Sequence, residues 1–415
     1  LKECLLKAQG ILDSKEVGSK LTSVEIHDIC CHCADAVLAG GVRRSAMCSL
    51  FSFDDQEMLT CKSGHWFEDN PQRGRANNSA TILRHRVTEQ DLKTFWEFVI
   101  ANNSGEPGMY FTNNADWGFN PCFEASLRFG QFCNLTTINA LAIDSQEKFN
   151  NLCKAATIIG TLQASYTDFH YVREFWKETT EKDALIGVSI TGIACGSLDK
   201  LSLTEGARIV RETNEEVAKL LGINSAARTT LLKPEGSTSL IFGSASGVHD
   251  WYDNFYNRRI TILKDDPIYS YLLDKIPELM EDNIFKPSIE SFAVMPMKSN
   301  SNGSINSSTF EMLERVRRYS VDWIKPGHKT GDNMHNVSCT IYVSSHEWYN
   351  VLDWIWKNRN DFACMSFFPK DDNVYTQAPH ESITEEEYLK RLSFVENIDL
   401  KNVSTDKETN FGLEP

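Results

Sequence analysis

Apolar stretches that suit buried strands alternate with amphipathic stretches that suit helices along most of this chain. The clearest is ALIGVSITGIA at 184–194, which carries no charged side chain and precedes an amphipathic stretch at 204–223. A strand that is apolar throughout must be covered on both faces, as in a parallel sheet built from βα units. We therefore predict an α/β protein, and a barrel is one such architecture. Further predicted strands are 45–53, the end of 105–111, 258–263, 291–296 and 336–343, and further predicted helices are 22–39, 88–103, 145–165, 171–181, 309–324, 346–358 and 384–394.

The bulk composition excludes several classes of protein. A length of 415 residues fits two or three domains, or a single α/β barrel. The net charge of −15 argues against nucleic-acid binding through a basic surface. The sequence contains neither a run of eighteen apolar residues nor a secretory leader, so we expect no membrane association and a cytoplasmic location. Because the chain opens inside a helical stretch without a Met, we expect it to be part of a longer protein.

Twelve cysteines are too few for a disulfide scaffold of this length, and most are expected to be small buried side chains. Three of them lie in CCHC at 30–33, which could suggest a zinc site. Zinc sites usually pair one such cluster with a second at a distance, and no second cluster has matching spacing. The interpretation that we favour is a structural helix, and no metal is assigned. The polar clusters VRRSA (42–46) and RGRANNSA (73–80) could contact a substrate, but loops that cap neighbouring elements are favoured.

The loop KPEGSTS at 233–239 has parts of an anion site. It lacks the Gly-Lys-Ser/Thr end of a Walker A loop. Gly236 would let the backbone approach a ligand, and the following hydroxyls and helix amides would suit phosphate. The alternative is a solvated turn before a strand, and composition alone does not decide between them.

The segment NPCFE at 120–124 places a thiol between an amide and a carboxylate. In an extended segment, Asn120, Cys122 and Glu124 would project to one side and could line one pocket. A carboxylate beside a thiol raises the thiol pKa, so the pattern is poor for a thiolate nucleophile. It suits a neutral thiol that donates a hydrogen atom, with the carboxylate as acid/base. Cys133 could supply reducing equivalents if a second cysteine lay nearby. The alternative is a buried cysteine in a loop with a solvated glutamate.

Several stretches together resemble the catalytic chain of ribonucleotide reductases. NPCFEASLRFGQFCNLTTIN (120–139) is similar to the finger-loop signature of that family, and the short gap between Cys122 and Cys133 resembles the monomeric adenosylcobalamin-dependent ribonucleoside-triphosphate reductases. The similarity runs in order along nearly the whole chain. The other stretches that carry it are 39–46, 75–82, 105–111, 155–171, 184–194, 233–249, 333–343 and 375–384.

The resemblance implies a ten-stranded α/β barrel with a finger loop through its centre. It implies that Cys122 becomes the thiyl radical that abstracts the 3′ hydrogen atom of the substrate. By the same resemblance, Glu124 is the general base at the 3′-hydroxyl, Asn120 positions substrate hydroxyls, and Cys133 is one thiol of the reducing pair. The substrate phosphates would be held by Pro234, Glu235, Gly236, Ser237 and Thr238.

The resemblance also implies the cofactor and partners. Adenosylcobalamin is the expected cofactor, a ribonucleoside triphosphate the substrate, a thioredoxin-type protein the reductant and a deoxynucleotide the effector, with the protein a monomer. No stretch has a readable corrin-binding motif, so cofactor-binding residues are not assigned. We expect residues 1–398 to form one part of the catalytic barrel, with the finger loop at about 119–135, and 399–415 to form a polar tail.

The chain departs from the family pattern at several points. Gly41, Phe123 and Ala125 replace residues that are usual in the family. The redox partner of Cys133 and the effector loop are expected upstream of Leu1, and a second cysteine pair after Pro415. The alternative reading is a split or truncated reductase that binds nucleotide or a partner chain without turnover.

Overall fold

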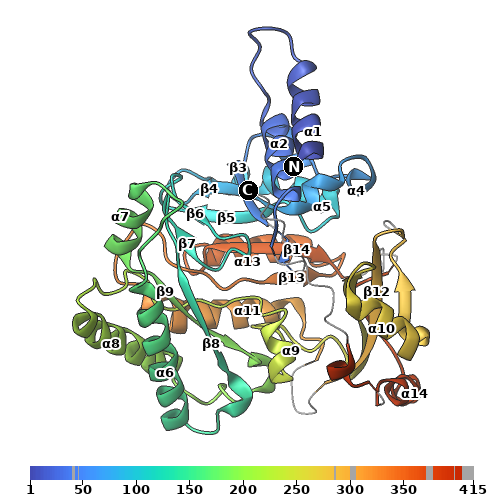
Figure 1. The fold of residues 1–415 in the computed structure, drawn as a ribbon. Coiled ribbons are helices and arrows are strands. Elements are labelled where there is room, and N and C mark those ends of the chain that lie inside the picture. The colour runs from blue at the N-terminus through green and yellow to red at the C-terminus, as the bar shows by residue number, and fades with distance from the viewer. Residues whose placement is uncertain are drawn as a thin grey trace. The chain divides into compact units, whose positions relative to one another are not determined.

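The computed structural model describes residues 1–39, 43–44, 46–284, 287–299, 305–370, 377–396 and 398–403 (Figure 1). The chain divides into two compact units. The large unit comprises Leu1–His249 and Ser307–Asp372, and the small unit comprises Asp250–Asn306 and Asn373–Pro415. The expected division into 1–398 and 399–415 stays a prediction, because residues from 404 onward lie outside the described part.

A five-stranded sheet forms the first part of the large unit, in the order β13-β14-β5-β4-β3. Neighbouring strands are parallel except for the antiparallel pair β14–β5. Trp96, on a helix that follows β4, is fully buried, and its indole lies 4.8 Å from the Phe367 ring on β14. Removal of such a buried aromatic side chain would cost about 3–5 kcal/mol. The strands are β3 (Met47–Ser52), β4 (Ala76–Leu83), β5 (Gly108–Thr112), β13 (Thr340–Val343) and β14 (Cys364–Pro369).

A second strand pair, β8 (Asn134–Asn139) and β9 (Ile186–Thr191), is parallel. The segment 228–232 connects this pair to the first sheet: Thr230 bridges Val188 on β9, and Leu232 bridges Val337 just before β13. Every residue of β9 is buried, as the apolar pattern predicted.

The helices of the large unit begin and end at recognisable capping residues. Thr22 and Thr88 each form a capping box, and the helix Leu203–Leu221 is followed by Gly222 in the left-handed conformation. The helices are α1 (Lys2–Asp13), α2 (Ser23–Asp35), α3 (Gln56–Thr60), α4 (Trp66–Asp69), α5 (Glu89–Asn102), α6 (Gln146–Ala164), α7 (Glu174–Asp183), α8 (Leu203–Leu221), α9 (Thr238–Phe242), α11 (Thr309–Tyr319), α12 (Lys325–Gly327) and α13 (Trp348–Asn358).

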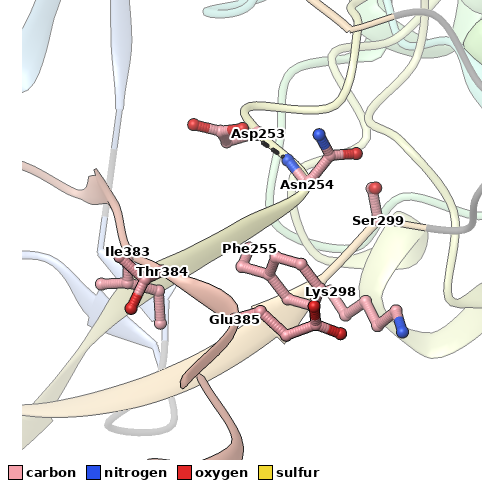
Figure 2. Close-up of a pocket in the computed structure, with 8 residues that line it drawn as sticks. All are labelled: Asp253, Asn254, Phe255, Lys298, Ser299, Ile383, Thr384 and Glu385. Carbon is pink, nitrogen blue, oxygen red and sulfur yellow. Dashed lines mark hydrogen bonds between the residues drawn. The ribbon is translucent and has the colours of Figure 1, made fainter. Parts of the chain in front are cut away.

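The described residues of the small unit form an antiparallel sheet in the order β11-β12-β10-β15, with the α-helices α10 and α14. Its own core contains Ile262, Leu272 and Ile276. Figure 2 shows a surface pocket of about 360 Å³ in this unit, where the Lys298 ammonium lies 5.3 Å from the Phe255 ring. No predicted site residue lines this pocket. The elements are β10 (Phe255–Leu263), β11 (Met280–Asp282), β12 (Glu290–Lys298), β15 (His380–Ser382), α10 (Pro267–Lys275) and α14 (Glu385–Val395).

Two predictions from the sequence were wrong, one about strand pairing and one about the polar cluster at 73–80. The strands predicted at 258–263 and 291–296 pair with each other in antiparallel fashion, so they do not belong to parallel βα units. The cluster at 73–80 is not a capping loop, because most of it forms the start of β4 in the interior of the sheet. Much of 42–46, together with Gly41, lies outside the described residues.

Candidate active site

The tip of the predicted finger loop (about 119–135) is a tight turn between two short antiparallel strands, β6 (Gly118–Phe119) and β7 (Ser126–Leu127). The Phe123 amide donates to the Asn120 carbonyl at 2.9 Å, and Phe123 adopts a left-handed φ of 61°. The Asn120 Oδ1 accepts from the amides of Glu124 and Ala125 at 3.1 and 2.9 Å. The extended segment expected for 120–124 is therefore not formed, because the Asn120 side chain closes the turn. An asparagine that accepts from nearby amides is a common turn former.

Two side chains from the segment before β13 hold the finger loop. The His335 Nδ1 accepts from the Ser126 amide at 3.0 Å, and the Asn336 Nδ2 donates to the Phe123 carbonyl at 3.0 Å. The backbone N–H of Asn336 also donates to the Glu124 carbonyl at 2.9 Å. The stretch 333–343 resembles the reductase family in sequence, but the resemblance assigned no role to His335 or Asn336. A polar run ahead of a buried strand was the available signal.

Aromatic side chains pack against one another at the base of the loop. The Phe123 ring packs on Phe119, and the Phe119 ring meets the buried Tyr110 ring edge-on at 5.1 Å. On another side, the Asn77 Nδ2 on β4 donates to the Pro121 carbonyl at 2.6 Å. The residue before Cys122 is thus fixed to the sheet, which explains how the loop presents one thiol at a defined point.

Cys122 is exposed at the loop tip, whereas Glu124 is only 2% exposed. Desolvation by the surrounding protein raises the Cys122 thiol pKa, and the Glu124 carboxylate raises it further. Only the second cause is visible in the sequence. Burial also raises the pKa of the Glu124 carboxyl, and hydrogen bonding with Asn120 opposes that rise. The site therefore holds a neutral thiol beside a carboxyl group that binds a proton more readily than usual.

Lys233 is a site residue that sequence reasoning missed. Its ammonium lies 3.5 Å from the Glu235 carboxylate and lowers the pKa of both Cys122 and Glu124. Glu235 is buried with a φ of 55°, and the Thr137 hydroxyl on β8 donates to its carboxylate at 2.7 Å. The loop at 233–239 and the finger loop are thus in electrostatic contact.

The remaining phosphate-loop residues face solvent to different degrees. Gly236 and Ser237 are exposed, and Pro234 and Thr238 are half-buried. The loop leads into the short helix α9 and not into the strand of the alternative interpretation. The assignment of phosphate to these residues stays a prediction.

Cys133 is half-buried beyond the second strand of the loop. Burial raises its thiol pKa to about 12, while the Arg228 guanidinium opposes the rise. Arg228 is fully buried against Asp183 at 3.1 Å, and its guanidinium lies 4.6 Å from the Trp117 ring. Gln131 donates to the same Asp183 carboxylate at 2.9 Å, so this ion pair also holds the chain just before Cys133. All twelve cysteines are free thiols.

The cluster CCHC at 30–33 lies in the last turns of α2. Cys31 and His32 are buried there, whereas Cys30 and Cys33 are exposed. Within the part of the chain that the structure describes, no group of His, Cys, Asp and Glu side chains has the arrangement of a metal site. Among the same residues, no helix is long and apolar enough to span a membrane.

The fold and the loop define the class of this protein, a ribonucleotide reductase fold. A solved structure of a B12-dependent, class II ribonucleotide reductase superposes on this chain with a TM-score of 0.71 at 23% identity. The superposition covers 96% of this chain and 60% of the solved chain. The predicted fold class is thereby confirmed. No family model matches the chain.

Curated relatives narrow the resemblance to one branch. The adenosylcobalamin-dependent ribonucleoside-triphosphate reductase of Lactobacillus acidophilus is 24% identical over 100% of this chain, and that of Euglena gracilis is 25% identical over 95%. The chain is a relative of these adenosylcobalamin-dependent reductases, as its motifs predicted. It spans 60% and 55% of their respective lengths.

Proposed function

We propose that this chain carries the catalytic finger loop of an adenosylcobalamin-dependent ribonucleoside-triphosphate reductase. Such an enzyme converts ribonucleoside triphosphates to 2′-deoxyribonucleoside triphosphates, the precursors of DNA. The observation that carries the proposal is the exposed, neutral Cys122 thiol beside the buried Glu124 carboxyl and Lys233.

The chemistry of this site fits the cofactor. When bound, adenosylcobalamin would supply the radical that removes the hydrogen atom from the Cys122 thiol. A thiol can give up a hydrogen atom only while it is protonated, and the raised pKa of Cys122 keeps it protonated near neutral pH. Cys122 is exposed at the loop tip, where a bound cofactor and a bound nucleotide could both reach it.

The proposed steps divide among four side chains. The Cys122 sulfur radical takes the 3′ hydrogen atom of the substrate, and Glu124 accepts the 3′-hydroxyl proton. Loss of the 2′-hydroxyl as water requires two electrons and two protons. Cys133 and a second thiol supply them and become a disulfide. Asn120 orients the substrate hydroxyls.

The substrate phosphates would bind at Pro234, Glu235, Gly236, Ser237 and Thr238. Two features support this site: Gly236 and Ser237 are exposed, and the ammonium of Lys233 lies beside the loop. Phosphate favours backbone amides and a nearby cation. We further propose a thioredoxin-type protein as the reductant of the disulfide and a deoxynucleotide as the effector. We also propose that the protein is a monomer and acts in the cytoplasm.

The test is Cys122→Ser in the complete protein. The matched control is Cys30→Ser, because Cys30 is also exposed but lies far from Cys122 in the sequence. A hydroxyl holds its hydrogen atom more strongly than a thiol does, so we expect Cys122→Ser to lose turnover while it still binds the nucleotide. The control should retain turnover. Normal deoxynucleotide formation by Cys122→Ser would refute the role of this residue.

A further inference from the structure

Helices α1 and α2 lie side by side and bring two cysteines together (Figure 1). Cys4 is in the first turn of α1, and Cys33 is in the last turn of α2. Their Sγ atoms are 3.9 Å apart, although 29 positions separate them in the sequence. Such a distance is close to van der Waals contact between two sulfur atoms, so a disulfide requires a movement of about 2 Å.

The two thiols differ in access to solvent. Cys4 is 7% exposed and is the one buried residue of the fully described α1, whereas Cys33 is exposed. An exposed cysteine can react with an oxidant in solution, and a buried neighbour can then resolve the product. Cys31 does not compete, because it is buried and its sulfur lies 3.7 Å from the His27 ring.

The attachments of the two helices also differ. α2 is held against the rest of the large unit, since Asp28 accepts two hydrogen bonds of 2.7 Å from Arg73. On α1, by contrast, the leucines at 5, 6 and 12 are exposed. A bond at Cys4 would therefore tie the weakly packed helix to the firmly attached one.

We propose that Cys4 and Cys33 form a reversible disulfide that fastens α1 to α2 when the surroundings become oxidising. The oxidant is a small disulfide such as oxidised glutathione. The Cys33 thiolate attacks it, forms a mixed disulfide and releases one thiolate. The Cys4 thiolate then attacks the Cys33 sulfur and releases the second. The protein loses two electrons and two protons, and the oxidant becomes two thiols.

The surroundings of Cys33 set the rate of this reaction. Desolvation raises the Cys33 pKa, and the neighbouring thiols of Cys4 and Cys30 raise it further. Because only the thiolate attacks a disulfide, the rate should increase as the pH rises through the alkaline range. In a reducing compartment the pair stays as two thiols.

The experiment uses the complete protein, reduced, desalted and exposed to oxidised glutathione, then alkylated and digested with trypsin without reduction. Cys4 lies in the tryptic peptide 3–7, and Cys30, Cys31 and Cys33 share the peptide 21–43. We expect the two peptides to be joined with a loss of about 2 Da, and dithiothreitol to separate them. Since one peptide contains three cysteines, Cys33→Ser and Cys30→Ser identify the partner. The link should vanish in Cys33→Ser and persist in Cys30→Ser.

Several outcomes would overturn the proposal. These are recovery of peptide 3–7 with Cys4 alkylated after oxidation, a glutathione adduct on Cys33 that does not proceed to the link, or a link that survives Cys33→Ser. Thermal unfolding gives a second measurement: oxidation should raise the melting temperature by a few degrees in the parent and in Cys30→Ser, but not in Cys33→Ser. None of these readouts depends on reductase activity.

Discussion

The replacement Asn336→Ala tests how the finger loop is held. The Asn336 side chain is buried and makes four hydrogen bonds. It donates to the carbonyls of Phe123 and Cys364, and it accepts from the amides of Ala363 and Cys364. Truncation therefore leaves four buried backbone groups without this partner, and the hydrogen-bonded bridge from Phe123 to the start of β14 is lost.

The cost follows from these four contacts. A typical hydrogen bond contributes about 1 kcal/mol net, and an unsatisfied buried group costs about 1–3 kcal/mol. With partial relaxation, we expect Asn336→Ala to lower the free energy of unfolding by about 3–4 kcal/mol. A matched control is Asn224→Ala, because the exposed Asn224 makes one hydrogen bond, to the Glu181 carbonyl at 3.0 Å. Its loss should cost less than about 1 kcal/mol.

Urea unfolding followed by tryptophan fluorescence measures the two changes, since Trp96 and Trp323 are buried in the large unit. Alkylation of Cys122 in the folded protein gives a local readout, and a loosened loop should change its rate. Equal unfolding midpoints for Asn336→Ala and Asn224→Ala would show that the loop is held by other contacts.

Three further changes have expected outcomes. Burial raises the Glu124 pKa, so the ionised carboxylate destabilises the fold at a pH above that raised pKa. Glu124→Gln should therefore unfold at a higher temperature near pH 8, and the difference should fade as the pH falls through the raised pKa and vanish below the ordinary carboxyl pKa. Arg228→Met removes the cation that opposes the high Cys133 pKa, so iodoacetamide should alkylate Cys133 more slowly, and the free energy of unfolding should drop by about 3–5 kcal/mol. Gly247→Ala combines a φ of 52° with a clash against the Lys233 carbonyl of the proposed phosphate loop. If the proposed function holds, it should raise KM for nucleotide more than Gly222→Ala, which has a φ of 71° and open space.

Periodicity predicted the elements that carry strong local signals. The helices α5, α6 and α8 and the strand β9 lie within a few residues of their predicted bounds, because caps and apolar spacing are local properties. β4 was missed because its start, Ala76 to Ser79, contains polar residues in the sheet interior. Asn78 satisfies such a position by contacts with His27 and Cys61, and these partners lie far away in the sequence.

The site shows the same division. Local reasoning about Cys122 and Glu124 gave the correct direction for the thiol pKa, since both groups belong to one short segment. The contributions of Lys233, His335 and Asn336 required the folded chain, because they lie more than a hundred positions from the loop. The turn at Asn120 was also missed, as alternation describes strands and not a turn closed by a side chain.

The way in which Asn120 closes the turn limits how it can recognise a ligand. Its Oδ1 accepts two hydrogen bonds from the backbone, which occupy both lone pairs of that oxygen. Only the Nδ2 hydrogens remain, and one of them serves the hydrogen bond that lowers the Glu124 pKa. In the proposed substrate complex, Asn120 would therefore donate one hydrogen bond to a nucleotide hydroxyl through its remaining N–H. That hydroxyl would direct its own proton elsewhere, and Glu124 is the neighbouring group that we propose as its acceptor.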